Sequence, residues 1–134
     1  MPAEKIGSLT AQTTLKTLPA NETFPRFETS ATGGGTLAGV EVQCMATYAA
    51  EIRPSGFLYG ACPNAGVIMA ADGVATFRAT GAGSFTEDGG AAFKGVAYFE
   101  TTAPSLASLN GAAVVYNWDV DAEGMATWEL WEWK

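Results

Sequence analysis

Short glycine-containing turn signals recur along this chain and separate segments rich in valine, threonine and aromatic residues. Asp-Gly and Asn-Gly pairs tolerate positive φ angles, which the tight turns of twisted hairpins require. The segments between the turns are about eight to ten residues long, a spacing typical of a meandering antiparallel sheet. The turn signals are Pro54-Ser55-Gly56, Asp72-Gly73, Asp88-Gly89-Gly90, Asn110-Gly111 and Asp121-Ala122-Glu123-Gly124.

The pattern predicts one all-β domain over residues 1–134, most simply a closed eight-stranded antiparallel β-barrel. A barrel closes the two edges that an open sheet of about eight strands would expose, and a two-sheet β-sandwich is the alternative. The third strand is long enough to need a bend or a bulge, and residues 104–109 are expected to form one helical turn. The predicted strands are 6–15, 23–32, 39–53, 57–62, 67–70, 74–85, 92–101, 112–120 and 125–133.

Composition excludes several function classes. The chain has 134 residues and no histidine, so histidine-based nucleophile systems, histidine acid–base chemistry and histidine metal ligands are absent. Seven basic residues, all isolated, stand against 14 acidic ones for a net charge of −7. Nucleic acid and anionic membrane surfaces both attract clustered positive charge, so neither is an expected partner.

The two cysteines, Cys44 and Cys62, are too few for a disulfide scaffold and too few for a cysteine-rich zinc site. We interpret them as reduced, partly buried thiols. Residues 1–16 lack a basic start followed by an apolar segment, so no secretory signal is evident and a cytoplasmic location is expected. No metal and no cofactor is predicted.

Two motifs resemble ligand-binding loops without the required context. Gly33-Gly34-Gly35-Thr36-Leu37-Ala38 matches a dinucleotide loop in letters, but a strand rather than a helix follows it, so a flexible hairpin loop is expected. Asp119-Val120-Asp121-Ala122-Glu123-Gly124 resembles half of a calcium loop, but its twelfth position is Leu130. A solvated acidic hairpin turn is the expected structure there.

Ionisable residues within predicted strands are the candidates for chemistry. A carboxyl group inside an apolar barrel acquires a raised pKa and can act as an acid or a base, while a neighbouring arginine or tyrosine can orient a substrate oxygen. Glu41, Arg78 and Tyr98 are the candidate catalytic residues. The alternative is that the strand carboxylates and Arg78 all lie on the solvated outer face.

Aromatic residues are the candidates for ligand contact. In the final strand, alternation places Trp131 and Trp133 on one face and Trp128 on the other. These indoles either seal the barrel or form a wall for an apolar ligand or a subunit interface. The candidate ligand-binding residues are Tyr48, Tyr59, Phe99, Tyr116, Trp118 and Trp131.

Several motifs in the second half of the chain recur in one superfamily. They are Gly81-Ala82-Gly83-Ser84-Phe85, Phe93-Lys94-Gly95-Val96-Ala97-Tyr98-Phe99, Leu109-Asn110-Gly111 before a strand, and the tryptophan-rich end. With them, residues 59–134 resemble small bacterial barrels related to the allene oxide cyclase and dirigent superfamily. The resemblance implies an eight-stranded barrel with an apolar cavity and a tendency to form homo-oligomers, and it carries over no catalytic residue.

The leading functional hypothesis is a small β-barrel that binds an apolar small molecule in its interior, with cofactor-free cyclase or isomerase activity as one form of it. Such catalysis would fold the substrate into a reactive conformation. The alternatives are a non-catalytic small-molecule-binding barrel and a structural homo-oligomeric module.

Overall fold

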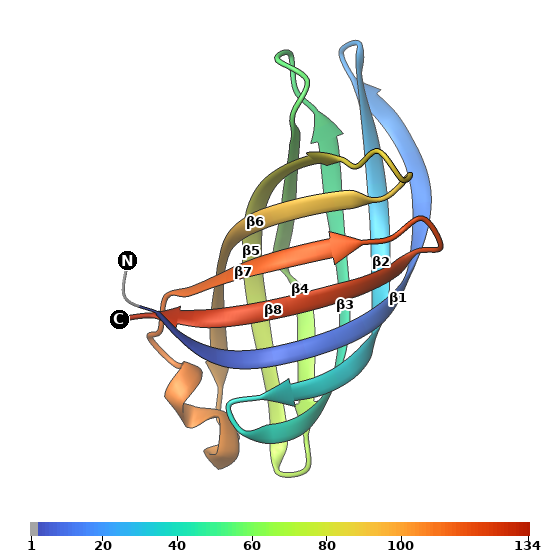
Figure 1. Ribbon diagram of the computed structural model, residues 1–134. Coiled ribbons are helices and arrows are strands. Elements are labelled where there is room, and N and C mark those ends of the chain that lie inside the picture. Colours follow the sequence, from blue (N-terminus) through green and yellow to red (C-terminus); the bar gives the residue numbers. More distant parts are fainter. Residues whose placement is uncertain (1–2) are drawn as a thin grey trace.

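The chain forms a closed antiparallel β-barrel of eight strands in sequence order (Figure 1). The computed structural model describes residues 3–134, so Met1 and Pro2 of the predicted domain lie outside the described residues. Every strand pairs with the next, and β1 pairs with β8, which excludes the sandwich alternative. The strands are β1 (Ala3–Asn21), β2 (Phe24–Leu37), β3 (Val40–Ile52), β4 (Leu58–Ala70), β5 (Gly73–Phe85), β6 (Ala91–Thr101), β7 (Val114–Val120) and β8 (Met125–Trp133), with a 3-10 helix, η1 (Pro104–Leu109), between β6 and β7.

The predicted strands 57–62 and 67–70 are parts of the single strand β4. Its register against β5 shifts between the pairs Cys62 with Ala79 and Gly66 with Phe77, so β4 carries a bulge where the sequence indicated a break. Asn64, at the centre of this bulge, has a φ of 59°. The β3–β4 register shifts at the same place, between Ala46 and Ala49, because the extra residues of β4 lie there. The bulge or bend predicted for the third strand is therefore found in β4, while β3 pairs with β2 without interruption.

The predicted turn glycines adopt the left-handed backbone that their positions require. Gly56, Gly89 and Gly124 lie in the turns after β3, β5 and β7, with φ values of 97°, 92° and 84°. Added side chains at these positions would strain the backbone, so glycine fixes where these strands reverse.

The glycine-rich segment Gly33 to Gly35 is not the flexible loop that the sequence suggested. It lies within β2 and pairs with β1 on one side and β3 on the other. A Cβ atom at Gly33 would stand 2.0 Å from the backbone oxygen of Thr10, and one at Gly35 would stand 2.2 Å from that of Ser8. Glycine here permits close approach of the neighbouring strands.

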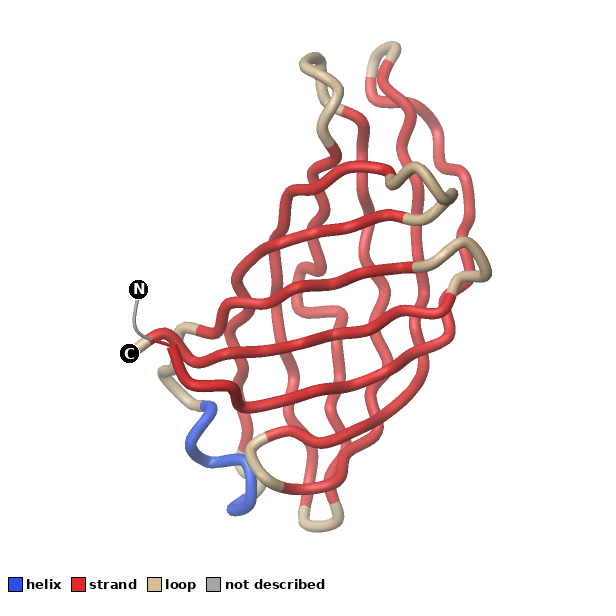
Figure 2. The backbone as a smooth tube through the Cα atoms, in the orientation of Figure 1, coloured by secondary structure: helices blue, strands red, loops and turns tan. Residues whose placement is uncertain are grey.

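One end of the barrel is closed by η1, which lies beside the strand ends at the lower left of Figure 2. Leu106 and Leu109 of η1 are buried in the main hydrophobic core. The Asn110 side chain fixes the end of the helix: its Oδ1 accepts the Thr101 backbone N–H at 2.9 Å, and its Nδ2 donates to the Thr101 carbonyl at 3.0 Å. The helical turn predicted over 104–109 is therefore confirmed, and it forms the cap of what we call the closed end.

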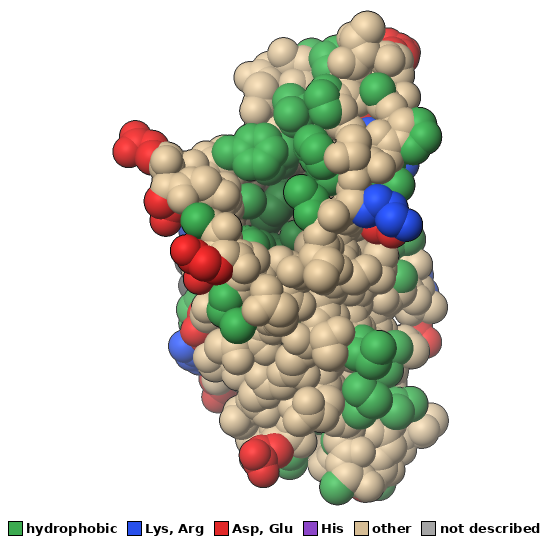
Figure 3. All heavy atoms as spheres, turned by 90° about the vertical axis from the view of Figure 1, so that its right-hand side faces the viewer, with side chains coloured by type: hydrophobic (Ala, Val, Ile, Leu, Met, Phe, Trp, Pro, Cys, Tyr) green, Lys and Arg blue, Asp and Glu red, His purple; other side chains and the backbone are tan. Residues whose placement is uncertain are grey.

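The opposite end is more loosely packed. We call it the open end; it carries the turns at 22–23, 53–57, 86–90 and 121–124. Its buried core is a small cluster of Ala50, Leu58 and Phe93. Figure 3 shows a hollow in the upper half of the molecule with hydrophobic side chains around it. Leu15 and Phe85, on the strand faces that point inward elsewhere in the barrel, are 68% and 60% exposed.

Candidate functional site

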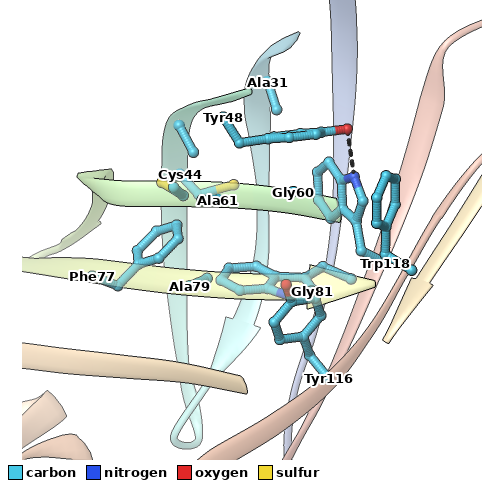
Figure 4. Close-up of a pocket in the computed structure, with 14 residues that line it drawn as sticks. Ala31, Cys44, Tyr48, Gly60, Ala61, Phe77, Ala79, Gly81, Tyr116 and Trp118 are labelled. Atoms are coloured by element: carbon cyan, nitrogen blue, oxygen red, sulfur yellow. Dashed lines mark hydrogen bonds between the residues drawn. The ribbon is translucent and has the colours of Figure 1, made fainter. Parts of the chain in front are cut away.

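An apolar cavity of about 60 Å³ lies inside the barrel (Figure 4). Strands β2 to β8 contribute its walls, and none of the described residues that line it is charged. The lining residues are Ala31, Cys44, Ala46, Tyr48, Gly60, Ala61, Cys62, Phe77, Ala79, Gly81, Phe93, Tyr116, Trp118 and Trp128.

An aromatic cluster lies along one side of the cavity and extends toward the closed end. Trp128 of β8 is its centre, with ring centroids 5.1 Å from Phe77, 5.9 Å from Tyr116 and 6.1 Å from Trp118. Phe99 completes the cluster, 5.3 Å from Phe77 and 6.2 Å from Trp128. These contacts between large rings fix the shape of the wall and leave little room for rearrangement on that side.

Glycines in neighbouring strands provide the space that Tyr116 occupies. A Cβ atom at either Gly81 or Gly95 would lie 2.7 Å from the Tyr116 hydroxyl oxygen. The hydroxyl donates to the backbone carbonyl of Thr80 at 3.0 Å. Tyr116 is therefore anchored to the wall, and its ring, not its hydroxyl, is the surface that it offers to the cavity.

Tyr48 and Trp118 join across the lumen. Tyr48 comes from β3 and Trp118 from β7, and the strand order places these strands on opposite sides of the barrel. Trp118 Nε1 donates to the Tyr48 hydroxyl oxygen at 3.0 Å, and the two rings meet edge to face with centroids 6.0 Å apart (Figure 4). Phe93 also contacts the Tyr48 ring edge to face, at 6.1 Å. We call this hydrogen-bonded pair the crossbar.

The Tyr48 hydroxyl has a second neighbour on its own side of the barrel. Thr29 lies directly opposite Tyr48 in the β2–β3 ladder and is 6% exposed. Burial raises the pKa of the Tyr48 hydroxyl, and the nearby Thr29 side chain acts in the opposite direction. The Tyr48 and Thr29 hydroxyls and the Trp118 indole N–H are thus neighbouring polar groups in an otherwise apolar interior.

The ionisable groups of the cavity are all held in their neutral forms. Burial raises the pKa of the Tyr48 and Tyr116 hydroxyls and of the Cys44 and Cys62 thiols. Both cysteines are buried and free, as expected from the sequence. Because each group stays protonated at neutral pH, the cavity can form hydrogen bonds but holds neither an anionic base nor a thiolate nucleophile.

The predicted ligand-binding residues divide between the two sides of the wall. Tyr48, Tyr116 and Trp118 line the cavity, and Phe99 lies in the core toward the closed end. Tyr59 faces outward and is 42% exposed. Trp131 also lies outside, with the Lys5 ammonium group 5.7 Å from its ring centroid. The strand alternation accounts for this division, because Tyr59 and Trp131 adjoin the inward-facing Leu58 and Leu130.

The structure does not bring the candidate catalytic residues together. Arg78 and Tyr98 lie opposite one another on β5 and β6. Glu41 lies two strands away on β3, where it pairs with Thr36 of β2. All three are exposed on the outer face. Arg78 makes an ion pair with Glu100, with 3.9 Å between nitrogen and oxygen. A solvated outer face, the alternative considered from the sequence, is where these residues lie.

Sequence reasoning missed several cavity residues, among them Cys44, Phe77, Phe93 and Trp128. The signal for them was present in the same period-two alternation. Phe93 shares a strand face with Phe99, and Cys44 shares one with Tyr48. Selecting residues by their inward face rather than by their chemical type would have found them.

The acidic turn between β7 and β8 is closed by the side chain of Asp121. Asp121 Oδ1 accepts the backbone N–H groups of Glu123 and Met125 at 3.0 and 2.9 Å, as in an ordinary aspartate-capped turn. Among residues 3–134, no group of three or more carboxylate or thiol side chains is arranged to hold a metal ion.

Comparison with known proteins identifies the fold. No protein-family model matches the chain, and no curated protein sequence matches it. Similar solved structures include a conserved protein of unknown function from Rhodopseudomonas palustris, with 15% identity, a TM-score of 0.82 and coverage of 98% of this chain and 96% of that one. A protein of unknown function from Clostridium acetobutylicum has 13% identity and a TM-score of 0.82 over the whole of both chains.

A third similar structure is a beta-barrel like protein from Acinetobacter baumannii. It has 12% identity, a TM-score of 0.80 and coverage of 100% of this chain and 98% of that one. At these identities the likeness shows a shared fold alone. The chain is thus a small β-barrel similar in fold to two proteins of unknown function and to one described as beta-barrel like. Within residues 3–134 no helix has the length and apolarity needed to cross a membrane.

Proposed function

We propose that this barrel binds a small, uncharged and mainly apolar molecule at its open end, with part of the molecule inside the cavity. The observation that carries the proposal is the cavity wall, in which apolar side chains surround a few neutral hydroxyl and thiol groups. Pockets of this composition, with few polar groups at fixed positions, are the usual form of small-molecule sites. The resemblance to the allene oxide cyclase and dirigent superfamily supports the same function.

Binding without acid–base catalysis is favoured by the protonation of the cavity groups. A general base needs a pKa near the working pH, and burial moves the pKa values of the two lining tyrosines and two lining cysteines upward, away from it. The carboxylates at Glu41 and Glu100 are exposed on the outer face. Assembly into a homo-oligomer and a cytoplasmic location stay predictions from the sequence.

The first test is native mass spectrometry of freshly purified protein, followed by solvent extraction and mass analysis of whatever dissociates. A discrete additional mass that extracts into organic solvent is expected. The same spectra give the number of subunits.

The second test uses a neutral fluorescent probe, N-phenyl-1-naphthylamine, with energy transfer from the interior tryptophans as the signal. Ala46→Leu adds three carbon atoms inside the cavity and so takes up space that the probe would fill. We expect the variant to bind the probe at least about tenfold more weakly, because the probe then buries less apolar surface. Ala82→Leu is the matched control, because Ala82 is exposed on the outer face of β5. Absence of both a bound molecule and probe binding in a folded protein, or equal effects of the two variants, would contradict the proposed function.

A further inference from the structure

The crossbar of Tyr48 and Trp118 divides the lumen at the level of the cavity. It connects β3 to β7 across the barrel, and Phe93 packs against it from β6. Toward the closed end lies the tightly packed cluster of Phe77, Phe99 and Trp128. A molecule that comes in from the open end therefore meets the crossbar before it meets the aromatic cluster.

The free space is too small for most ligands while the crossbar is intact. The cavity measures about 60 Å³, whereas pockets for drug-sized ligands are roughly 300–1,000 Å³. Trp128 and Phe77 are 5% and 4% exposed and are held on several sides, while Trp118 and Tyr48 are half-buried beside the hollow. Separation of the crossbar is the change that makes room at the lowest cost in packing.

Separation leaves one polar group without a partner. The Tyr48 hydroxyl keeps a polar neighbour, the side chain of Thr29, which lies opposite it on β2. The Trp118 Nε1–H group loses its acceptor, and a ligand that fills the surrounding space excludes water from it. A buried donor without an acceptor is costly, so a ligand that supplies an acceptor oxygen at this position gains affinity over one that does not.

The charge of the wall narrows the ligand class further. No lysine or arginine is among the described residues that line the cavity. A carboxylate or phosphate would lose its hydration without gaining a counter-charge there, whereas a neutral carbonyl accepts a hydrogen bond at a much smaller desolvation cost.

We propose that the ligand is a neutral, mainly apolar molecule with a carbonyl-type oxygen, and that this oxygen replaces the Tyr48 hydroxyl as the acceptor of the Trp118 indole N–H. This inference rests on the proposed function and specifies its ligand class. The crossbar is accordingly a recognition element, with Trp118 as the donor and Tyr48 as the internal competitor of the ligand.

Acetophenone and ethylbenzene form a matched pair of probes, because they differ by a carbonyl in place of a methylene group. Both are titrated into ¹⁵N-labelled protein, and amide and indole resonances give the affinities and the site together. The hydration difference between the probes is the same for every variant, so it cancels when the affinity ratio is compared across variants. Trp118→Phe identifies the Trp118 indole resonance by its disappearance.

The two crossbar variants are expected to change different quantities: Trp118→Phe changes the ratio of the two affinities, and Tyr48→Phe changes both affinities together. Trp118→Phe removes the donor and should lower the ratio of acetophenone to ethylbenzene affinity about 2- to 10-fold, the effect of one net hydrogen bond. Tyr48→Phe removes the competing acceptor, so neither probe has to break the crossbar hydrogen bond. It should raise the affinity of both probes and leave their ratio close to the wild-type value. In the wild type, acetophenone should shift the Trp118 indole N–H resonance more than ethylbenzene does.

The outcomes separate this inference from the proposed function. If both probes bind in the interior but Trp118→Phe leaves their affinity ratio unchanged, the carbonyl inference is wrong and apolar binding stands. If neither probe shifts any interior resonance of the wild type, both proposals are wrong. If a variant fails to fold, the wild-type protein still decides: equal shifts of the Trp118 indole resonance by the two probes would overturn the carbonyl inference.

Discussion

Gly66 in the β4 bulge offers a sharp test of how tightly the closed half of the barrel is packed. A Cβ atom at Gly66 would lie 2.2 Å from Cζ of Phe77, whereas ordinary van der Waals contact begins at 3.4 Å. The Phe77 ring would therefore have to move by about 1.2 Å. Phe77 is 4% exposed, and the rings of Phe99 and Trp128 pack against it, which restricts how far its ring can move.

Overpacking of a filled core costs about 1–3 kcal/mol, and the rigid surroundings of Phe77 place Gly66→Ala near the upper value. For a domain of this size, each kcal/mol lowers the melting temperature by roughly 3–5 °C. Gly60→Ala is the matched control on the same strand, because its nearest contact is an ordinary 3.5 Å to Cε2 of Phe93. Gly60→Ala should be neutral, or stabilising by up to about 1 kcal/mol through reduced freedom of the unfolded chain.

Urea unfolding of the two single variants, of Phe77→Leu and of the Gly66→Ala/Phe77→Leu double variant measures the coupling directly. Leucine lacks the ring atoms that clash, so the added methyl group should cost less than about 1 kcal/mol in the leucine background. Equal losses for Gly66→Ala and Gly60→Ala, or additive effects of Gly66→Ala and Phe77→Leu, would refute the steric argument.

Three further predictions follow from the ionisable groups. The hydroxyl and backbone N–H of Ser105 hold the pKa of Asp72 below its usual value of 3.8. This pair therefore stabilises the fold above pH 3.8, and the stabilisation is lost as the pH falls through the pKa of the folded state. Ser105→Ala should raise the Asp72 pKa in a carboxyl NMR titration, and an unchanged pKa would exclude the hydroxyl as the cause of the shift. Burial raises the pKa of Tyr116 above 10. The contribution of Tyr116 to the free energy of unfolding is therefore complete below pH 10, and it declines above pH 10 because the tyrosine ionises first in the unfolded chain. Tyr116→Phe should make the loss of stability at alkaline pH less steep in denaturant titrations, and an equally steep loss would contradict this explanation. Cys44 and Cys62 should react slowly with Ellman's reagent in the native protein and rapidly in guanidinium, and rapid native labelling would show that they are accessible.

The fold was predictable because the residues at its turns are ones that favour turn conformations locally. Gly56, Gly89 and Gly124 each mark a reversal whose positive φ angle favours glycine over other residues. The glycines at 33–35 have a different role, which is to let neighbouring strands approach closely. This role is evident only from the folded barrel. The β4 bulge at Asn64 is equally invisible in the sequence, because a proline–asparagine pair also signals a turn.

The candidate site was only partly predictable for a related reason. Alternation divides the residues of a strand between two faces. The face that is apolar along more of its length is the one that points into the barrel. Glu41 adjoins the buried Val42, so its outward position was available from the pattern. The partnership of Tyr48 with Trp118 was not available, because it joins strands that are never neighbours in the sheet.

The unequal packing of the two ends has a consequence for how this barrel can change over evolutionary time. Stability is concentrated near η1, where Leu106 and Leu109 complete a continuous core, and amide hydrogen exchange should be slowest there. The hairpins of the open end contribute little to that core, so substitutions among them cost little folding free energy. A barrel built in this way can acquire new ligands by altering one rim while the other end preserves the scaffold.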